Sequence, residues 1–67
     1  MDIKVNGKTR PVAPGATLAD LLAALGLEEK RLAIEHNGRV LAAEADRGKV
    51  ALAEGDTIEI VRLVGGG

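Results

Sequence analysis

The stretch TLADLLAALGL, residues 17–27, predicts a short amphipathic helix around which the other elements can be placed. Thr17 occupies the N-cap position, and Asp20 follows three residues later in a shortened capping box. Gly26 supplies a left-handed stop, after which Leu27 can fold back onto Leu22 in a Schellman arrangement. One apolar stripe at helical spacing contains Leu18, Leu21, Leu22 and Leu25. We expect this stripe to be part of the core and not a cofactor-binding surface.

Two strands are predicted before the helix. The alternating stretch DIKVN, residues 2–6, is typical of a half-buried strand. Asn6-Gly7 follows as a strong hairpin signal, because both residues tolerate a positive φ. The return strand is expected over 8–13, and Pro11 places it at a sheet edge because proline has no N–H to donate.

More strands are predicted after the helix. A solvated connection, EEKR (28–31), leads to a strand over 32–36 and to a second hairpin signal at Asn37-Gly38. A return strand begins at 39–41. The segment 42–49 fits either a short helical turn or an irregular crossover.

The last predicted elements are a brief strand at Val50 and Leu52 and the longest strand, over 57–64. Ile58 and Ile60 alternate with polar residues and should face the core. A right-handed crossover through the helix then lets the first and last strands pair in parallel at the sheet centre.

This element order predicts an α+β fold of the ubiquitin-like β-grasp class. Its mixed sheet has four to five strands, with one helix packed across one face. Residues 1–64 are expected to form the β-grasp domain, and 65–67 a flexible C-terminal glycine tail.

Composition excludes several functions. The net charge is −1 and there are no aromatic residues, which argues against nucleic-acid binding. No apolar stretch approaches the ~20 residues of a membrane span, and no signal peptide is visible. The absence of cysteine is compatible with a cytoplasmic protein. With neither a cysteine nor a second histidine, His36 cannot complete a metal site, and it is expected to be a turn-flanking surface residue. No catalytic residue is expected, because the chain has no Ser or Cys nucleophile.

Four stretches that span most of the chain resemble the ThiS family of sulfur-carrier proteins. They are VNG (5–7), PGATLADLLAALGL (14–27), AIEHNG (33–38) and EGDTIEIVRLVGGG (54–67). One departure follows the second hairpin: the family often has Pro-Arg and then Trp, where this chain has AAEADR (42–47). The resemblance therefore implies nothing about that segment.

The resemblance implies a role for the C-terminal glycines in thiamine biosynthesis. A ThiF-like enzyme would use ATP to adenylate Gly67, and sulfur from a cysteine desulfurase would convert it to a thiocarboxylate. A ThiG-like thiazole synthase would then accept the sulfur, with Gly65 and Gly66 threading into the partners' active sites. The chain would be a protein substrate without a cofactor of its own, and not an enzyme.

The end of the last strand is a candidate docking surface for these partners. If the alternation continues, Val61 and Leu63 stand on the face that the helix leaves open, while Arg62 and Val64 follow the isoleucine face. Two exposed aliphatic residues at the base of a threading tail form a plausible docking patch. A bulge near Val61 would instead bury both.

Other functions fit parts of the same pattern. A molybdopterin-type sulfur carrier or a ubiquitin-like protein modifier would use the same terminal chemistry. Leu63-Val64 stands where molybdopterin carriers often have proline before the glycine pair, which favours thiamine. A TGS-like passive interaction module would be part of a longer chain and would not need terminal glycines. In an arbitrary protein, a glycine run is usually a linker.

Overall fold

The structure is a computed structural model that describes residues 1–27, 31–41 and 44–63. Its elements, in chain order, are β1 (Asp2–Val5), β2 (Lys8–Pro11), α1 (Leu18–Ala24), β3 (Leu32–His36), β4 (Arg39–Leu41), the 3-10 helix η1 (Glu44–Lys49) and β5 (Thr57–Arg62). The strands form one sheet in the order β2-β1-β5-β3-β4. β1 and β5 are parallel neighbours at its centre, whereas the other pairs are antiparallel.

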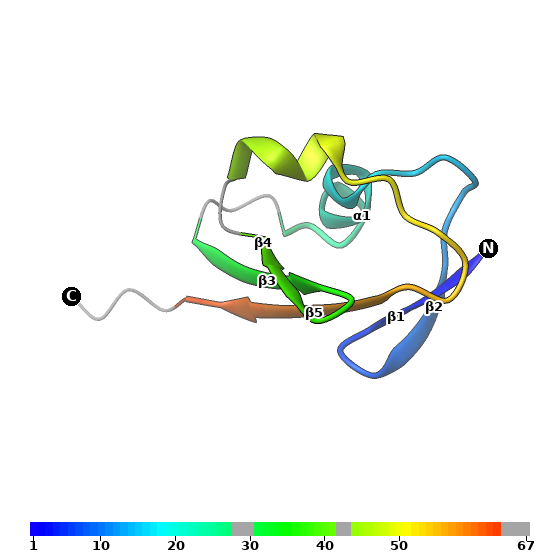
Figure 1. Cartoon of the computed structure of the whole chain (residues 1–67), viewed down its shortest axis with the longest axis horizontal. Helices are drawn as coiled ribbons and strands as arrows, with labels where there is room; N and C mark the ends of the chain where they lie inside the picture. Colours follow the sequence, from blue (N-terminus) through cyan, green and yellow to red (C-terminus); the bar gives the residue numbers. More distant parts are fainter. Residues whose placement is uncertain (28–30, 42–43, 64–67) are drawn as a thin grey trace.

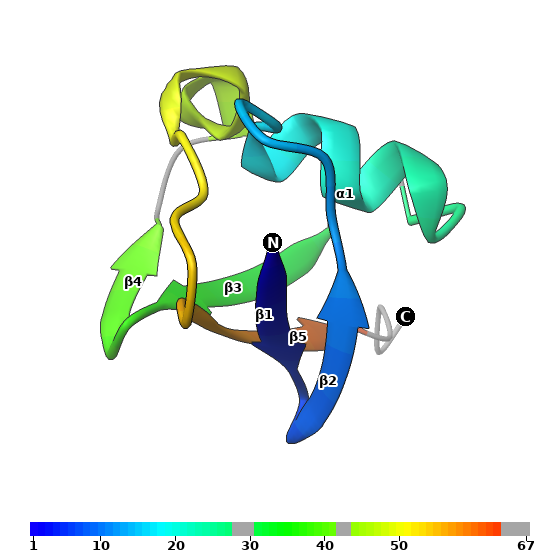
Figure 2. The ribbon, with the colours of Figure 1, turned by 90° about the vertical axis from the view of Figure 1, so that its right-hand side faces the viewer.

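Helix α1 and the 3-10 helix η1 lie on the same side of the sheet, and the described residues place no helix over the other face (Figures 1 and 2). This arrangement, with a parallel central pair reached through the helix, confirms the predicted β-grasp class. No helix in the described part of the chain is long and apolar enough to cross a membrane.

Both ends of α1 are capped as the sequence predicts. The backbone N–H of Thr17 donates to Asp20 Oδ2 at 2.9 Å, and the N–H of Asp20 donates to Thr17 Oγ1 at 3.2 Å. At the other end, the Leu27 N–H donates to the Leu22 carbonyl at 2.7 Å, and Gly26 has a φ of 73°. These bonds satisfy backbone groups that a helix of only 7 residues would otherwise expose.

The hydrophobic cluster between sheet and helix consists of aliphatic side chains. Its buried members are Ile3, Val5, Leu18, Leu21, Leu22, Leu32, Ile34, Leu52, Ile58 and Ile60. Leu25, the fourth residue of the helical stripe, is only partly buried against this cluster. The alternating residues of the strands therefore face the helix, as their period of two predicts.

Two strand predictions are corrected. β2 ends at Pro11 and not at Ala13, although Val12 and Met1 still exchange backbone hydrogen bonds of 2.8 and 3.0 Å. The predicted strand at Val50 and Leu52 does not form. This segment pairs with the loop before α1 through one isolated bridge, so it never joins the sheet.

The remaining expectations are met in part. Residues 44–49 form η1, the helical alternative for that segment. The last strand is observed over Thr57–Arg62, and Val64 lies outside the described residues. So do most of the predicted 28–31 connection and the glycine tail, residues 65–67.

Candidate functional site

Strand β5 lies at the sheet centre, and its two flanks are paired over different lengths. On the β1 side, backbone hydrogen bonds run from Lys4 N–H to the Asp56 carbonyl and from Asn6 N–H to the Ile58 carbonyl, both at 2.9 Å. On the β3 side, the register continues as far as Leu32 opposite Arg62. The C-terminal end of β5 therefore extends beyond its β1 partner.

The side chain of Asn6 continues the pairing where β1 stops. Its Oδ1 accepts from the Ile60 N–H at 2.7 Å, and its Nδ2 donates to the Ile60 carbonyl at 3.2 Å. The amide thus replaces one peptide unit of the missing strand. The sequence predicts the positive φ of Asn6, observed at 49°, but not this contact with a residue 54 positions away.

A second hairpin asparagine holds the start of β5. Asn37 Oδ1 accepts from the Thr57 N–H at 2.8 Å, and Asn37 Nδ2 donates to Asp56 Oδ1 at 3.1 Å. The other carboxylate oxygen, Asp56 Oδ2, accepts from the Ala53 N–H at 2.9 Å and lies 2.8 Å from His36 Nε2. This polar cluster ties the β3–β4 hairpin to the turn before β5.

The hydrogen bond from His36 is the largest cause that lowers the pKa of Asp56 below its ordinary value of 3.8. Bonds from Asn37 and Ala53 add to the effect, while burial opposes it. His36 flanks the turn as predicted, but its side chain is only 25% exposed and contacts the buried Asp56, so it is more than a surface residue. The sequence offered one signal for this contact, because Asp56 is an acidic residue directly before a buried strand. Its partner, His36, lies 20 positions away in the sequence, so the neighbouring residues could not identify it.

This polar cluster is a structural clamp and not a site for the terminal chemistry. It lies at the Thr57 end of β5, whereas Leu63 and the glycines follow the opposite end. Among the described residues, no group of three or more His, Cys, Asp or Glu side chains could hold a metal ion.

Val61 and Leu63 lie on the open face, as predicted, with 59% and 50% of their surfaces exposed. The register with β3 runs without interruption through Ala33 opposite Val61, so no bulge turns Val61 into the core. The Leu63 N–H extends the pairing by donating to the Arg31 carbonyl at 2.9 Å. Arg62 is exposed, and Val64 lies outside the described residues.

Sequence reasoning missed a further apolar residue on this face. Val40 of β4 is 71% exposed and lies opposite Glu35, which is two residues along β3 from Ala33, the residue that faces Val61. Diagonal neighbours on a sheet face are within reach of each other. We call the resulting surface the open-face patch; it consists of Ala33, Val40, Val61 and Leu63. The alternation of β4 could have indicated Val40, since the half-buried Leu41 follows it.

Two carboxylates border the open-face patch. Glu35 and Glu59 lie directly opposite each other on β3 and β5, and both are exposed. Like charges in this position destabilise a sheet. By register, Lys4 on the neighbouring strand β1 lies closest to Glu59, because it pairs with Thr57. Arg31 lies next to Leu63, whose N–H donates to the Arg31 carbonyl. The patch is therefore apolar, with the two carboxylates at one margin and Arg31 at another.

Known proteins of similar sequence agree with the family resemblance of the sequence. The profile of the ThiS family matches residues 3–67. The sulfur carrier protein ThiS of Bacillus subtilis is 38% identical over 97% of this chain and 98% of its own length. A thiazole synthase of Magnetococcus marinus is 37% identical over the whole chain, which spans only 20% of that protein.

A solved structure extends the likeness to three dimensions. The crystal structure of thiamine biosynthesis protein ThiS from Geobacter metallireducens superposes with a TM-score of 0.81. Its sequence is 33% identical, and the match covers 100% of both chains. The profile match and these full-length similarities show that the chain belongs to the ThiS family.

Proposed function

We propose that this protein is a sulfur carrier of thiamine biosynthesis that presents the carboxylate of Gly67 to partner enzymes. One observation carries the proposal: the end of β5 and the residue after it expose an apolar pair, Val61 and Leu63, shortly before a glycine run in a chain of the ThiS family. The names of the relatives, a sulfur carrier and a thiazole synthase, support the same pathway.

The chemistry starts from an inert carboxylate. A ThiF-like partner joins the Gly67 carboxylate to the α-phosphate of ATP, and pyrophosphate leaves. The resulting acyl-adenylate has a good leaving group, so persulfide sulfur supplied through a cysteine desulfurase displaces AMP. A second thiol of the partner then attacks the resulting acyl disulfide and forms a new disulfide with the donor cysteine. This releases the thiocarboxylate, which a ThiG-like thiazole synthase consumes. Because the first step consumes ATP, we place it in the cytoplasm.

In this proposal, the chain itself is substrate and carrier, and the partners perform catalysis. Glycine allows a backbone to pass close to other groups, which suits Gly65 and Gly66 for entry into narrow active sites. The lack of cysteine means that no thiol of the carrier competes for the activated terminus. The chemistry requires Gly67 to bear a free α-carboxylate.

The open-face patch is the docking surface in this scheme. Aliphatic contacts from Val61 and Leu63 would fix the domain, and Arg62 and Val64 lie in the same segment next to the tail. The opposed carboxylates of Glu35 and Glu59 complement a cation on the partner.

Intact mass spectrometry tests the proposal after incubation with ATP, a persulfide donor and the adenylating enzyme of the same organism. We expect an acyl-adenylate without the donor, and the mass of one oxygen-to-sulfur exchange with it. Deletion of Gly67 should abolish both products, and so should one alanine added after it. Matched unfolding curves would show that these variants still fold. Unchanged products from the deleted chain would contradict the assignment.

A further inference from the structure

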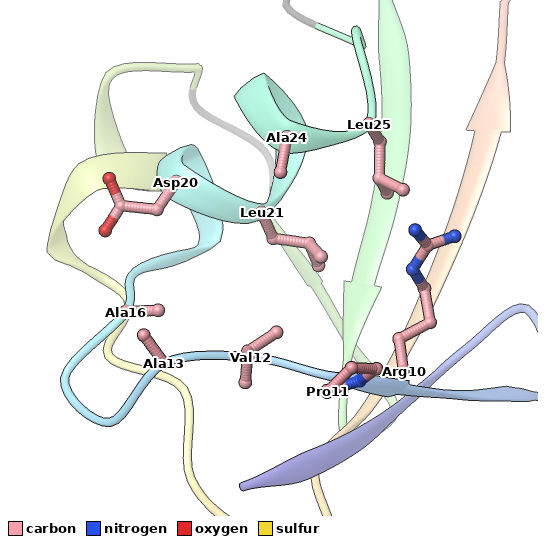
Figure 3. A pocket seen from close by; sticks show the side chains of 9 residues that line it. All are labelled: Arg10, Pro11, Val12, Ala13, Ala16, Asp20, Leu21, Ala24 and Leu25. Atoms are coloured by element: carbon pink, nitrogen blue, oxygen red, sulfur yellow. The ribbon is translucent and has the colours of Figure 1, made fainter.

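A groove runs between helix α1 and strand β2, on the side of the sheet opposite to the open-face patch (Figure 3). Two adjoining hollows of about 270 and 300 Å³ form it, and Arg10 and Leu25 line both. Aliphatic side chains line most of its length, namely Val5, Val12, Leu21, Leu25, Leu27 and Ile60. Each hollow has the size to accept aliphatic side chains, and is at or below the low end of the ~300–1,000 Å³ of small-molecule sites.

Strand β2 forms one wall of the groove and is an edge of the sheet. Among the described helices and strands, it contacts only β1. The opposite edge differs, because β4 also contacts η1. The β2 edge is thus the less covered of the two edges, and its free backbone groups are available for pairing.

The hydrogen-bond pattern shows which backbone groups are free. Met1 and Val12 exchange both of their backbone hydrogen bonds. Because such pairs alternate along an antiparallel ladder, Pro11 and Thr9 direct their backbone groups away from β1. Thr9 therefore offers an N–H and a carbonyl at the edge, while Pro11 offers a carbonyl alone. This edge suits a short added strand and not a long one.

Two cations flank these free groups. Arg10 lies opposite the buried Ile3 and Lys8 opposite the buried Val5, so both start on the groove side of β2. Figure 3 shows the Arg10 side chain reaching toward Leu25 across the groove. Neither cation forms an ion pair within the described residues. Asp20, the acidic residue lining the groove, is bound in the helix cap.

We propose that this groove binds an extended acidic–aliphatic segment of a partner protein, which adds to β2 as an extra strand. The segment exchanges backbone hydrogen bonds with Thr9, places aliphatic side chains in the two hollows, and pairs its carboxylates with Lys8 and Arg10. Main-chain bonds supply affinity in this mode, and pockets for alternate side chains supply specificity. Electrostatic complementarity selects an acidic segment over a neutral or basic one.

This site goes beyond the sulfur-carrier proposal and does not depend on it. The groove and the open-face patch lie on opposite sides of the sheet, so one partner can hold the domain through β2 while another contacts the patch. A carrier that visits successive enzymes gains local concentration from such a second attachment.

The test is a titration of the whole protein, followed by amide NMR, with the capped peptide Asp-Asp-Val-Ile-Val-Ile-Asp-Asp. We expect shifts at Thr9, Arg10 and Leu25, none at Val61, and affinity that falls as salt rises. The control peptide carries Lys for each Asp and should bind at least tenfold more weakly. A peptide N-methylated at its central residues cannot pair as a strand and should lose binding.

Charge reversal completes the test with a matched control. The double variant Lys8→Glu, Arg10→Glu should bind the acidic peptide at least tenfold more weakly. Lys4→Glu, on the other face of β1, should change the affinity for this peptide less than twofold. Three results would overturn the proposal: equal binding of the basic peptide, shifts confined to the open face, or no shift at millimolar peptide. In the last case, the Lys8 and Arg10 stems merely cover the edge of the core.

Discussion

Residues 57–60 of β5 and the segment 61–63, which ends one residue past β5, have different surroundings. Residues 57–60 are flanked on both sides, by β1 and the Asn6 amide on one and by β3 on the other, and they bury Ile58 and Ile60. Residues 61–63 are paired with the β3 side alone and expose Val61 and Leu63. One segment is the centre of the core, and the other presents side chains to solvent.

This difference shows how a small domain can combine a rigid centre with an accessible end. The hairpin at Asn6-Gly7 terminates β1, so the chain leaves the sheet with only one paired flank. Stability and docking are then carried by different residues of one strand. Substitutions in the two segments should therefore affect different measurements.

The largest expected effect comes from the core segment. Ile58→Ala should lower the free energy of unfolding by about 2–5 kcal/mol, because it leaves a cavity in an aliphatic core. Leu22→Ala, from the facing helix, should fall in the same range of about 2–5 kcal/mol. Val61→Ala is the matched control, with an expected change of about 0.5 kcal/mol or less. Urea unfolding followed by circular dichroism measures the free energy of unfolding of all three variants. Equal losses of stability in Ile58→Ala and Val61→Ala would contradict the difference between residues 57–60 and residues 61–63.

The next effect concerns the clamp at the start of β5. Asp56→Asn should lower the free energy of unfolding by about 1–3 kcal/mol, because donors from His36 and Ala53 lose a charged acceptor.

The clamp also predicts a pH dependence with a definite sign. The pKa of Asp56 is lower in the folded state, so its contribution is present above the ordinary value of 3.8 and is lost as pH falls below it. Unfolding free energies measured between neutral and acidic pH should show this decline in the native protein. The decline should be shallower in Asp56→Asn. An identical slope of unfolding free energy against pH in both proteins would show that Asp56 does not cause the decline.

A smaller effect on stability is expected at Asn6, whose side-chain amide bonds the backbone of Ile60 beyond the end of β1. Asn6→Gly keeps the positive φ of the turn but removes both hydrogen bonds to Ile60, which should cost about 1 kcal/mol. Hydrogen exchange at the Ile60 amide should quicken more than at Ile58, because the Ile60 N–H loses its acceptor, Asn6 Oδ1. Residue 58 is still held against β1 by the bond from the residue 6 N–H to the Ile58 carbonyl. Equal acceleration at both amides would indicate general loosening instead.

The smallest predicted change is a gain. Glu59→Gln should raise the free energy of unfolding by roughly 0.2–1 kcal/mol, because it removes the repulsion from Glu35 across the open face. If the pair complements a partner's cation, the same variant binds that partner more weakly. If Glu59→Gln is more stable but binds the partner as tightly as the native protein does, Glu59 is not part of the docking surface.

Local patterns predicted the fold because each signal acts over a few residues. The capping box, the Schellman end and both Asn-Gly hairpins depend on neighbours in sequence, and all four form. The exposure of Val61 and Leu63 followed from strand periodicity. The parallel central pair followed from the connection through the helix.

Contacts between distant residues could not be predicted in the same way. The roles of Asn6 and His36 depend on Ile60 and Asp56, which reach them only after the sheet is assembled. Val40 joins the open-face patch through the register of β3 and β4. The sequence predicts a brief strand at Val50 and Leu52, yet Leu52 enters the core from a loop.

The most direct test of the divided strand is the double variant Val61→Ser, Leu63→Ser. Its unfolding free energy and its affinity for the adenylating enzyme of the same organism should be measured on the same preparation. We expect a nearly unchanged free energy of unfolding together with at least tenfold weaker binding. Loss of the fold would place the pair in the core, and a normal fold with normal binding would place the docking surface elsewhere.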